Sequence, residues 1–569
     1  MRPPAPVLGC PTHRPADPPR PDRDDAQTMT DAAAATRRQA LALGAGTAAA
    51  LAGLAPLAAR PALAQSPPGV LVMAKQIDDV TSLDPAEAFE YTGTEVVGNV
   101  YRKLVTTPNA DPARIVGELA ESFEASADNR TFTFRLRQGP RFASGNPVTA
   151  EDAAYTFRRV VALNKAPAFI VNQFGFTRDN SEERIRAADP RTLVLTTAEP
   201  TAPSFLYYCL SAAVGSVVER AAVQARAQGD DWGNGWLKQN SAGSGPFRLV
   251  SWRASEAITL EANPHAEAAP ATRRVVIRHM PDASAQLLGL QRGDVDVARN
   301  LVADQIAQVR ADSRFRVLDQ RKASLMYLSL SQRHPALARP EVRQAVKLAV
   351  DYEGIQRNIV PSTYAVHQAF LPEGLPGALT ERPFAQRQDE ARDLLRRAGL
   401  ADGFEVAFDY SSGAPISDIA QAIQAQLAAV GIRCRMVPGE MRQVITKTRA
   451  RQHEMAIVRW GSDYFDPHSN AEAFSMNPDN GDNARNRTLA WRASWEIPEF
   501  TARAAAYVRE TDTERRVLAY EALQREHQRV APFVILLQEI EVAATRANVR
   551  GFEMGPMSDR TSYERAAKA

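Results

Sequence analysis

The chain has 569 residues, of which 44% are hydrophobic, 24% charged and 7% aromatic. At about 100–200 residues per domain, this length excludes a single compact core and predicts three to five folded units, and the composition is unlike that of a disordered or fibrous chain. The 68 Lys and Arg residues against 66 Asp and Glu residues give a net charge of +2, which argues against a broad nucleic-acid-binding surface.

Residues 1–64 have the pattern of an export leader. Arg37 and Arg38 precede the uncharged stretch 40–59, which is made almost wholly of Ala, Leu and Gly, and Ala62 and Ala64 form an A-x-A cleavage site. This resembles a twin-arginine signal, which predicts a periplasmic protein, the twin-arginine export machinery as a partner, and cleavage near Ala64. A transmembrane helix is the alternative, but Ala and Gly insert poorly into a bilayer. Because Met29 would make a conventional start, residues 1–28 are interpreted as a gene-model extension.

Two cysteines, Cys209 and Cys434, follow the leader. An oxidising compartment would permit a disulfide between them. Their wide separation and apolar settings favour the other interpretation, two small hydrophobic side chains.

Periodicity predicts the first regular elements. Residues 130–137 alternate polar and apolar side chains, as a half-buried strand does. Thr149, with Asp152 three positions later, is typical of a helix N-terminus, and this helix should bury Ala153, Phe157 and Val160. A second helix should begin at Pro340, with one apolar face formed by Val342, Ala345, Val346 and Ala349.

The stretch 389–467 predicts a helix over 389–398, a strand over 404–408, a helix over 416–430 and a strand over 432–437. A β-α-β unit of this kind places parallel strands in one sheet. A further strand, 454–459, leads into the segment Trp460–Pro467. In open α/β sheets ligands bind beyond the carboxyl ends of the strands, so this segment is predicted to be a binding loop.

Catalytic and metal-binding patterns are missing from the sequence. His453 and Glu454 would need a second histidine at position 457, which is Ile457, and there is neither a nucleophile elbow nor a phosphate-binding loop. His453 and His468 are interpreted as one surface and one loop histidine rather than as metal ligands. The sequence therefore predicts binding rather than catalysis, with no metal and no cofactor.

An ordered series of motifs resembles family 5 of the extracytoplasmic solute-binding proteins, the dipeptide- and oligopeptide-binding proteins of peptide/nickel-type ABC importers. The resemblance covers about 71–552 and rests on Ser82-Leu83-Asp84-Pro85, Glu118–Phe123, 131–152, Gly243–Phe247 and Arg292–Asp296. It implies an α/β, two-lobed periplasmic-binding-protein fold of type II (cluster C), with a hinge and an additional inserted subdomain.

The same resemblance implies a division of the chain and its partners. Lobe I is expected at 65–108, 235–310 and 535–569, the inserted subdomain at 109–234 and lobe II at 311–534. The protein should be a monomer that closes around its ligand and presents the closed surface to an inner-membrane ABC permease.

Peptide-binding members of the family carry a W-x-x-D motif whose Asp pairs with the ligand's α-ammonium. Trp460-Gly461-Ser462-Asp463 matches it, followed by Tyr464, so these residues are predicted to contact the ligand, with Asp463 as the anchor. The alternative for Asp463 is a turn carboxylate that accepts hydrogen bonds from nearby backbone N–H groups. Trp460 would stack on the ligand or belong to the core.

Two departures from the family's patterns bear on specificity. Ile457 stands where some peptide binders have an Arg for the ligand carboxylate, and Arg459 directly precedes the Trp instead. Downstream, Trp491, Arg492 and Trp495 form an unusual aromatic stretch. Arg492 would either bind an acidic ligand group between two Trp faces or lie over packed rings.

These features together predict a periplasmic receptor that captures a short peptide or related amine-bearing solute and delivers it to an ABC importer. A nickel chelate, an opine-like compound or another organic solute is the alternative ligand. A secreted hydrolase or metalloenzyme on a similar scaffold is the alternative from another class.

Overall fold

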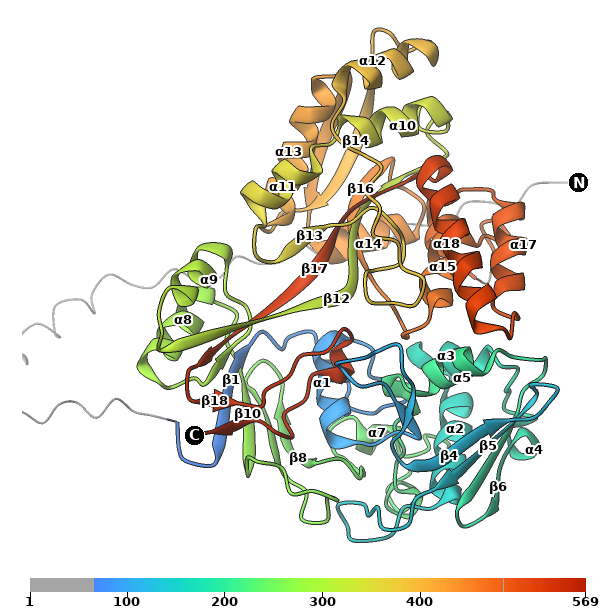
Figure 1. The fold of residues 1–569 in the computed structure, drawn as a ribbon, viewed down its shortest axis with the longest axis vertical. Helices are drawn as coiled ribbons and strands as arrows, with labels where there is room; N and C mark the ends of the chain where they lie inside the picture. Colours follow the sequence, from blue (N-terminus) through green and yellow to red (C-terminus); the bar gives the residue numbers. More distant parts are fainter. Residues whose placement is uncertain (1–65, 485) are drawn as a thin grey trace, which may run out of the picture. The chain divides into compact units, whose positions relative to one another are not determined.

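The computed structural model describes residues 66–484 and 486–569 (Figure 1). The chain divides into two units, Met1–Ala62 and Leu63–Ala569, and the description below concerns the second. The predicted leader, with Arg37, Arg38, Ala62 and Ala64, lies outside the described residues. Within the described ranges, no helix is both long enough and apolar enough to cross a membrane.

One mixed sheet runs through most of the second unit. Its strands are, in spatial order, β15 (Ile432–Gly439), β14 (Phe404–Ser411), β16 (Met455–Gly461), β12 (Phe315–Leu330), β17 (Phe533–Arg546), β11 (Val297–Ala298), β1 (Val70–Lys75), β10 (Arg274–His279), β9 (Ala257–Ala262) and β8 (Phe247–Arg253), with β13 (Tyr364–Val366) also paired to β17. The pairs of β14 with β15 and β16, and of β1 with β10 and β11, are parallel, and the remaining pairs are antiparallel.

The two longest strands, β12 and β17, lie side by side at the centre of this sheet (Figure 1). Their antiparallel pairing runs from Phe315 opposite Arg546 to Ser329 opposite Phe533, and its register shifts between Arg321 and Leu325. The unpaired stretch is bonded elsewhere. The Gln538 side chain donates to the Lys322 carbonyl at 3.0 Å, and Ala323 N–H donates to the Pro556 carbonyl at 2.9 Å.

A separate four-stranded sheet has the order β4 (Ala120–Ala125), β5 (Thr131–Leu136), β7 (Thr192–Thr196), β6 (Ile185–Asp189). Strand β5 confirms the strand predicted from alternation. The helix beside this sheet, α2 (Ala150–Leu163), begins at a capping box in which Thr149 and Asp152 each bond the other's backbone N–H, as predicted. Its predicted apolar residues Ala153, Phe157 and Val160 are buried in the core.

The β-α-β prediction is also confirmed. Helices α12 (Gln388–Arg397) and α13 (Ile416–Ala428) alternate with β14 and β15, which pair in parallel with Phe404 opposite Ile432. Helix α10 (Pro340–Ala349) begins at Pro340, and its four predicted apolar residues are buried. One boundary was wrong: β16 continues through Trp460 and Gly461, which pair with Leu325 and Ser324 of β12 and so are strand rather than loop residues.

The remaining α-helices and strands range in length from two to 18 residues. They are α1 (Tyr91–Val100), β2 (Val105–Thr106), β3 (Val116–Gly117), α3 (Phe169–Asn172), α4 (Ser181–Arg184), α5 (Pro203–Leu210), α6 (Arg220–Gln224), α7 (Asn234–Leu237), α8 (Ala283–Arg292), α9 (Ala303–Arg310), α11 (Tyr352–Ile359), α14 (Met441–Arg449), α15 (Pro467–Ser475), α16 (Leu489–Arg492), α17 (Pro498–Tyr507), α18 (Thr513–Val530), β18 (Val549–Arg550) and β19 (Ala567–Lys568). The division into lobes at 65–108, 235–310, 535–569 and 311–534, with an insertion at 109–234, stays a prediction.

Candidate functional site

The loop between β16 and α15 is held by its own backbone and by its neighbours. Ser462 N–H donates to the Ala323 carbonyl of β12 at 2.8 Å, and its hydroxyl donates to Asn470 Oδ1 at 2.7 Å. Asp463 N–H donates to the Ser469 hydroxyl at 2.8 Å. Both ends of the loop are therefore fixed, one to the central strand and one to α15, so the side chains it carries are presented in a defined direction.

Asp466 is the structural carboxylate of this loop. It is buried, it caps α15 by accepting a bond from His468 N–H at 2.9 Å, and it accepts two hydrogen bonds from the Arg516 guanidinium at 2.6 and 2.7 Å. The Arg516 guanidinium lies in turn over the Phe205 ring at 5.6 Å. The Asp466 carboxylate therefore has hydrogen-bond and charge partners within the protein and needs no ligand.

Asp463 has different surroundings. Its side chain is partly exposed, and across the described part of the chain no hydrogen bond or ion pair reaches its carboxylate. Desolvation and the neighbouring Glu472 raise its pKa to about 7, and Arg492 opposes the shift. The alternative of a turn carboxylate bonded to backbone N–H groups receives no support from these contacts. Asp463 is a carboxylate that a cation would stabilise.

Trp460 lies in β16, three residues before Asp463, and is partly buried. Its ring packs against a core that contains Val444, Val458 and Phe465, and its Nε1 is buried with no hydrogen-bond partner in the described structure. A buried indole N–H normally finds an acceptor. The structure thus supports both interpretations of Trp460. One face of its ring packs in the core, and in the described structure its Nε1–H is free to donate a hydrogen bond to a ligand.

Arg459 forms an ion pair within the protein. Its guanidinium donates to Glu539 of β17, which raises the pKa of Arg459 further above its usual value. Ile457, at the position where some peptide binders have an Arg, is fully buried in the core. Neither residue is therefore free to hold a ligand carboxylate.

Tyr91, the first residue of α1, meets the site from a distant part of the sequence. A Cβ placed on Gly461 would lie 2.6 Å from the Tyr91 hydroxyl, so the glycine leaves room for the Tyr91 side chain at the end of β16. Tyr91 is 50% exposed, unusually so for a tyrosine against a core strand. Sequence reasoning missed this residue, and no local signal could have found it, because 370 positions separate it from Gly461.

Three predicted site residues lie in the core instead. Tyr464 is buried, with its ring 5.9 Å from that of Phe205. Trp491 donates its Nε1 hydrogen to the Gly481 carbonyl at 2.8 Å, and Trp495 packs against Phe500. Both Trp rings are used by the core, and the two interpretations of Arg492, an acidic ligand group held between Trp faces or a side chain that lies over packed rings, stay predictions.

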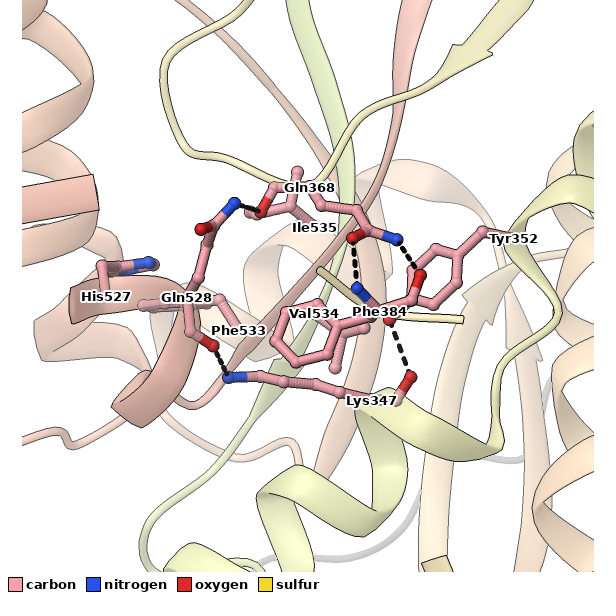
Figure 2. Close-up of a pocket in the computed structure, with 9 residues that line it drawn as sticks. All are labelled: Lys347, Tyr352, Gln368, Phe384, His527, Gln528, Phe533, Val534 and Ile535. Carbon is pink, nitrogen blue, oxygen red and sulfur yellow. Dashed lines mark hydrogen bonds between the residues drawn. The ribbon is translucent and has the colours of Figure 1, made fainter. Parts of the chain in front are cut away.

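Two hollows in the structure lie away from this loop. One is an open depression of about 440 Å³ on α12, lined by Glu390, Asp393, Arg396 and Arg397. The other, shown in Figure 2, has a volume of about 10 Å³, room for one water at most. There Lys347 donates to the Gln528 carbonyl at 2.7 Å, and burial lowers its pKa to about 7. Neither hollow has the features of a peptide site.

Two further predictions, on the cysteines and on the histidines, can be compared with the structure. Cys209 and Cys434 are both free thiols, the first buried and the second partly buried. The prediction of a surface and a loop histidine is wrong: His453 is buried with Nε2 2.9 Å from the Ser329 hydroxyl, and His468 is buried in α15. In the ranges that the structure describes, no group of three or more His, Cys, Asp and Glu side chains is placed to hold a metal ion.

Comparison with known proteins gives the family. Residues 114–482 match the sequence model for the middle region of the bacterial extracellular solute-binding proteins, family 5. The chain belongs to this family. It is 28% identical, over 500 residues, to the probable D,D-dipeptide-binding periplasmic protein DdpA of Escherichia coli, with 87% of this chain and 93% of the relative covered.

Solved structures agree on the fold. The periplasmic binding protein DppA of Helicobacter pylori, in complex with the peptide STSA, matches this family 5 protein with a TM-score of 0.73 at 23% identity, covering 88% of this chain and 98% of the other. The binding protein AgaA of A. tumefaciens, in complex with agropinic acid, matches with a TM-score of 0.70 at 22% identity, covering 88% and 99%. The predicted α/β, two-lobed periplasmic-binding-protein fold is thereby confirmed.

Proposed function

We propose that this solute-binding protein is the periplasmic receptor of an ABC importer and that it captures a short peptide, or a related amine-bearing solute, by lobe closure. Asp463 anchors the ligand's ammonium group. The observation that carries this proposal is that, in the described structure, the Asp463 carboxylate at the carboxyl end of β16 accepts no hydrogen bond, whereas the Ser462 hydroxyl and the Asp466 carboxylate of the same loop are bonded. Relatives whose names include dipeptide binding support the cargo class.

The remaining features of the proposal follow from the same assignment. The chain acts without catalysis, as a monomer, and delivers its ligand to an inner-membrane permease. Export runs through the twin-arginine machinery, with Arg37 and Arg38 as the signal and cleavage near Ala64.

The test is isothermal calorimetry of the purified protein with short peptides, beginning with Ala-Ala. We expect Asp463→Asn to weaken binding by about 2 kcal/mol, or about 30-fold, because the variant keeps the shape of the side chain and loses the charge that pairs with the ammonium. Asp389→Asn, at a fully exposed side chain of α12, is the matched control and should bind as the wild type does.

Three results would contradict the proposal. Equal affinity of the wild type and Asp463→Asn would reject the amine anchor. Cleavage of the peptide during incubation would favour the hydrolase alternative. Tighter binding of an opine such as agropinic acid, or of a nickel chelate, than of any peptide would replace the cargo class.

A further inference from the structure

Helix α5 packs against the loop that carries Asp463. Three buried residues share one side of this helix because they are spaced at i, i+3 and i+4, and we call this side the docking face: Phe205, Tyr208 and Cys209. The Phe205 ring centre lies 5.9 Å from that of Tyr464. The Tyr208 ring centre lies 6.1 Å from that of Phe465. Because Tyr464 and Phe465 directly follow Asp463, the helix contacts the same loop as the proposed ammonium anchor.

The docking face also meets α15 and α18. The His468 ring meets the Phe205 ring edge-on at 5.4 Å, and the Arg516 guanidinium lies 5.6 Å from the centre of the same ring. Tyr464 packs in the core of the predicted inserted subdomain, whereas Tyr208 packs in a core formed mainly by predicted lobe II. Each part of the chain therefore places a tyrosine ring in the core of the other.

Ring contacts, without hydrogen bonds, join the inserted subdomain to lobe II. In the ranges that the structure describes, no hydrogen bond and no ion pair links these two predicted parts. The contact with predicted lobe I is different. There Arg159 donates to the buried Asp84 carboxylate at 2.7 Å, and Val217 N–H donates to the Arg102 carbonyl at 2.9 Å. Since rings can separate without leaving polar groups unpaired, the docking face is the contact that an opening cleft would break.

The Tyr464 hydroxyl is a second observation that favours separation. Tyr464 is only 1% exposed, and its hydroxyl has no hydrogen-bond partner in the described structure. A buried hydroxyl without a partner destabilises the docked arrangement, whereas water would bind to it once the rings separate. The hydroxyl therefore shifts the balance between docked and separated arrangements towards separation.

We propose that α5 is a latch: its Phe205 and Tyr208 rings dock on the loop after Asp463 when the lobes close around a ligand, and they leave it when the cleft opens. The inference rests on the proposed capture by lobe closure and adds the contact that sets how long the closed state lasts. A ligand held by Asp463 and a helix docked on the next two residues both stabilise the same closed state, so they should favour each other.

The test measures the latch through Cys209, a free thiol that is fully buried on the docking face. The ligand-free protein is labelled with N-ethylmaleimide, and peptide mass spectrometry measures the reaction of Cys209 separately from that of Cys434. Phe205→Leu should raise the Cys209 rate by about tenfold, because it removes two ring pairs. Tyr464→Phe should lower the rate by about fivefold, because it removes the unpartnered hydroxyl.

Phe157→Leu is the matched control. Phe157 is buried in the same core as Phe205 but lies in α2, and in the described structure its ring is paired with no ring of α15 or of the Asp463 loop. This variant should lower the free energy of unfolding, measured with urea, and leave the Cys209 rate unchanged. If the Cys209 rate follows the free energy of unfolding in all three variants, the rings separate only when the protein unfolds, and the latch is rejected.

Calorimetry with Ala-Ala separates this inference from the proposed function. Saturating Ala-Ala should slow the labelling of Cys209 in the wild type, and Phe205→Leu should weaken Ala-Ala binding by up to about tenfold because fewer molecules are closed. If the wild type and Phe205→Leu bind Ala-Ala equally, capture stands and the latch is rejected. If Ala-Ala binds to neither, the peptide proposal fails, and opposite shifts of the Cys209 rate in Phe205→Leu and Tyr464→Phe would still support the latch, whereas unchanged rates would reject it.

Discussion

Two carboxylates three residues apart in one loop have opposite surroundings. Asp466 is buried, caps α15 and shares two hydrogen bonds with Arg516, whereas Asp463 is partly exposed and shares none in the described structure. A group whose charge is satisfied by the protein stabilises the fold, and a group whose charge is left unsatisfied has binding capacity that a ligand can use. Burial and partners, rather than residue type, distinguish the two roles.

The largest effect should come from breaking the satisfied pair. Asp466→Asn keeps the capping oxygen but leaves the Arg516 guanidinium buried without an anion, so we expect a loss of about 3–5 kcal/mol in the free energy of unfolding, measured by urea denaturation. Asp463→Asn is the matched control and should not lower that free energy at pH 7, because it removes a carboxylate whose ionisation the folded state disfavours. Equal losses of unfolding free energy in the two variants would show that the two carboxylates do not differ in their contribution to stability.

The second test uses pH to distinguish Asp463 from Asp466. Asp463 faces Glu472 of α15, which with desolvation raises its pKa to about 7, and Arg492 of α16, which opposes the shift. Because an ammonium binds the ionised carboxylate, affinity should rise with pH by up to about tenfold per unit below pH 7, then level off until the ligand amine loses its proton near pH 8. Calorimetry from pH 5 to 8 measures the profile.

Two variants check the origin of this pH dependence. Asp463→Asn should flatten the profile, and Glu472→Gln should move it to lower pH by removing a repelling charge. The effect on the unfolding of the ligand-free protein has the opposite sign: because the folded-state pKa is raised, the stability contributed by Asp463 is present at pH 4 and is lost as the pH rises to about 7. A profile that is unchanged in Asp463→Asn would assign the titration to another group.

The smallest effect should come from Gly461, which borders Asp463 but not Asp466. Its replacement by Ala puts a Cβ 2.6 Å from the Tyr91 hydroxyl. Tyr91 and Gly461 belong to different predicted lobes, so the clash should oppose closure and weaken binding by about 1 kcal/mol, or about fivefold, with little change in unfolding. Adding Tyr91→Phe removes the hydroxyl and should restore affinity. Persistent loss in the double variant would show that Tyr91 is not the obstacle.

The sequence allowed prediction where the determinants are local. Alternation and helical spacing predicted β5, α2 and the β-α-β unit, because each element's pattern is contained within its own residues. The Trp460–Asp463 motif was placed correctly at the end of a strand for the same reason, although β16 extends two residues further than expected.

The parts that could not be predicted depend on long-range packing. Tyr91 meets Gly461 across 370 positions, and nothing near either residue indicates the other. Trp491 and Trp495 were expected to face a ligand, but aromatic content alone does not tell whether a ring is covered by the rest of the fold, and here both rings are in the core.

The interruption in the β12–β17 ladder connects this loop to the centre of the sheet. Ala323 donates to Pro556 on one side and accepts from Ser462, the neighbour of Asp463, on the other. A single residue thus joins the loop to a stretch where the two long strands do not pair. The amide hydrogen of Ser462 should consequently exchange with deuterated solvent at the rate at which the loop separates from β12, and this rate would report how long a captured solute stays enclosed.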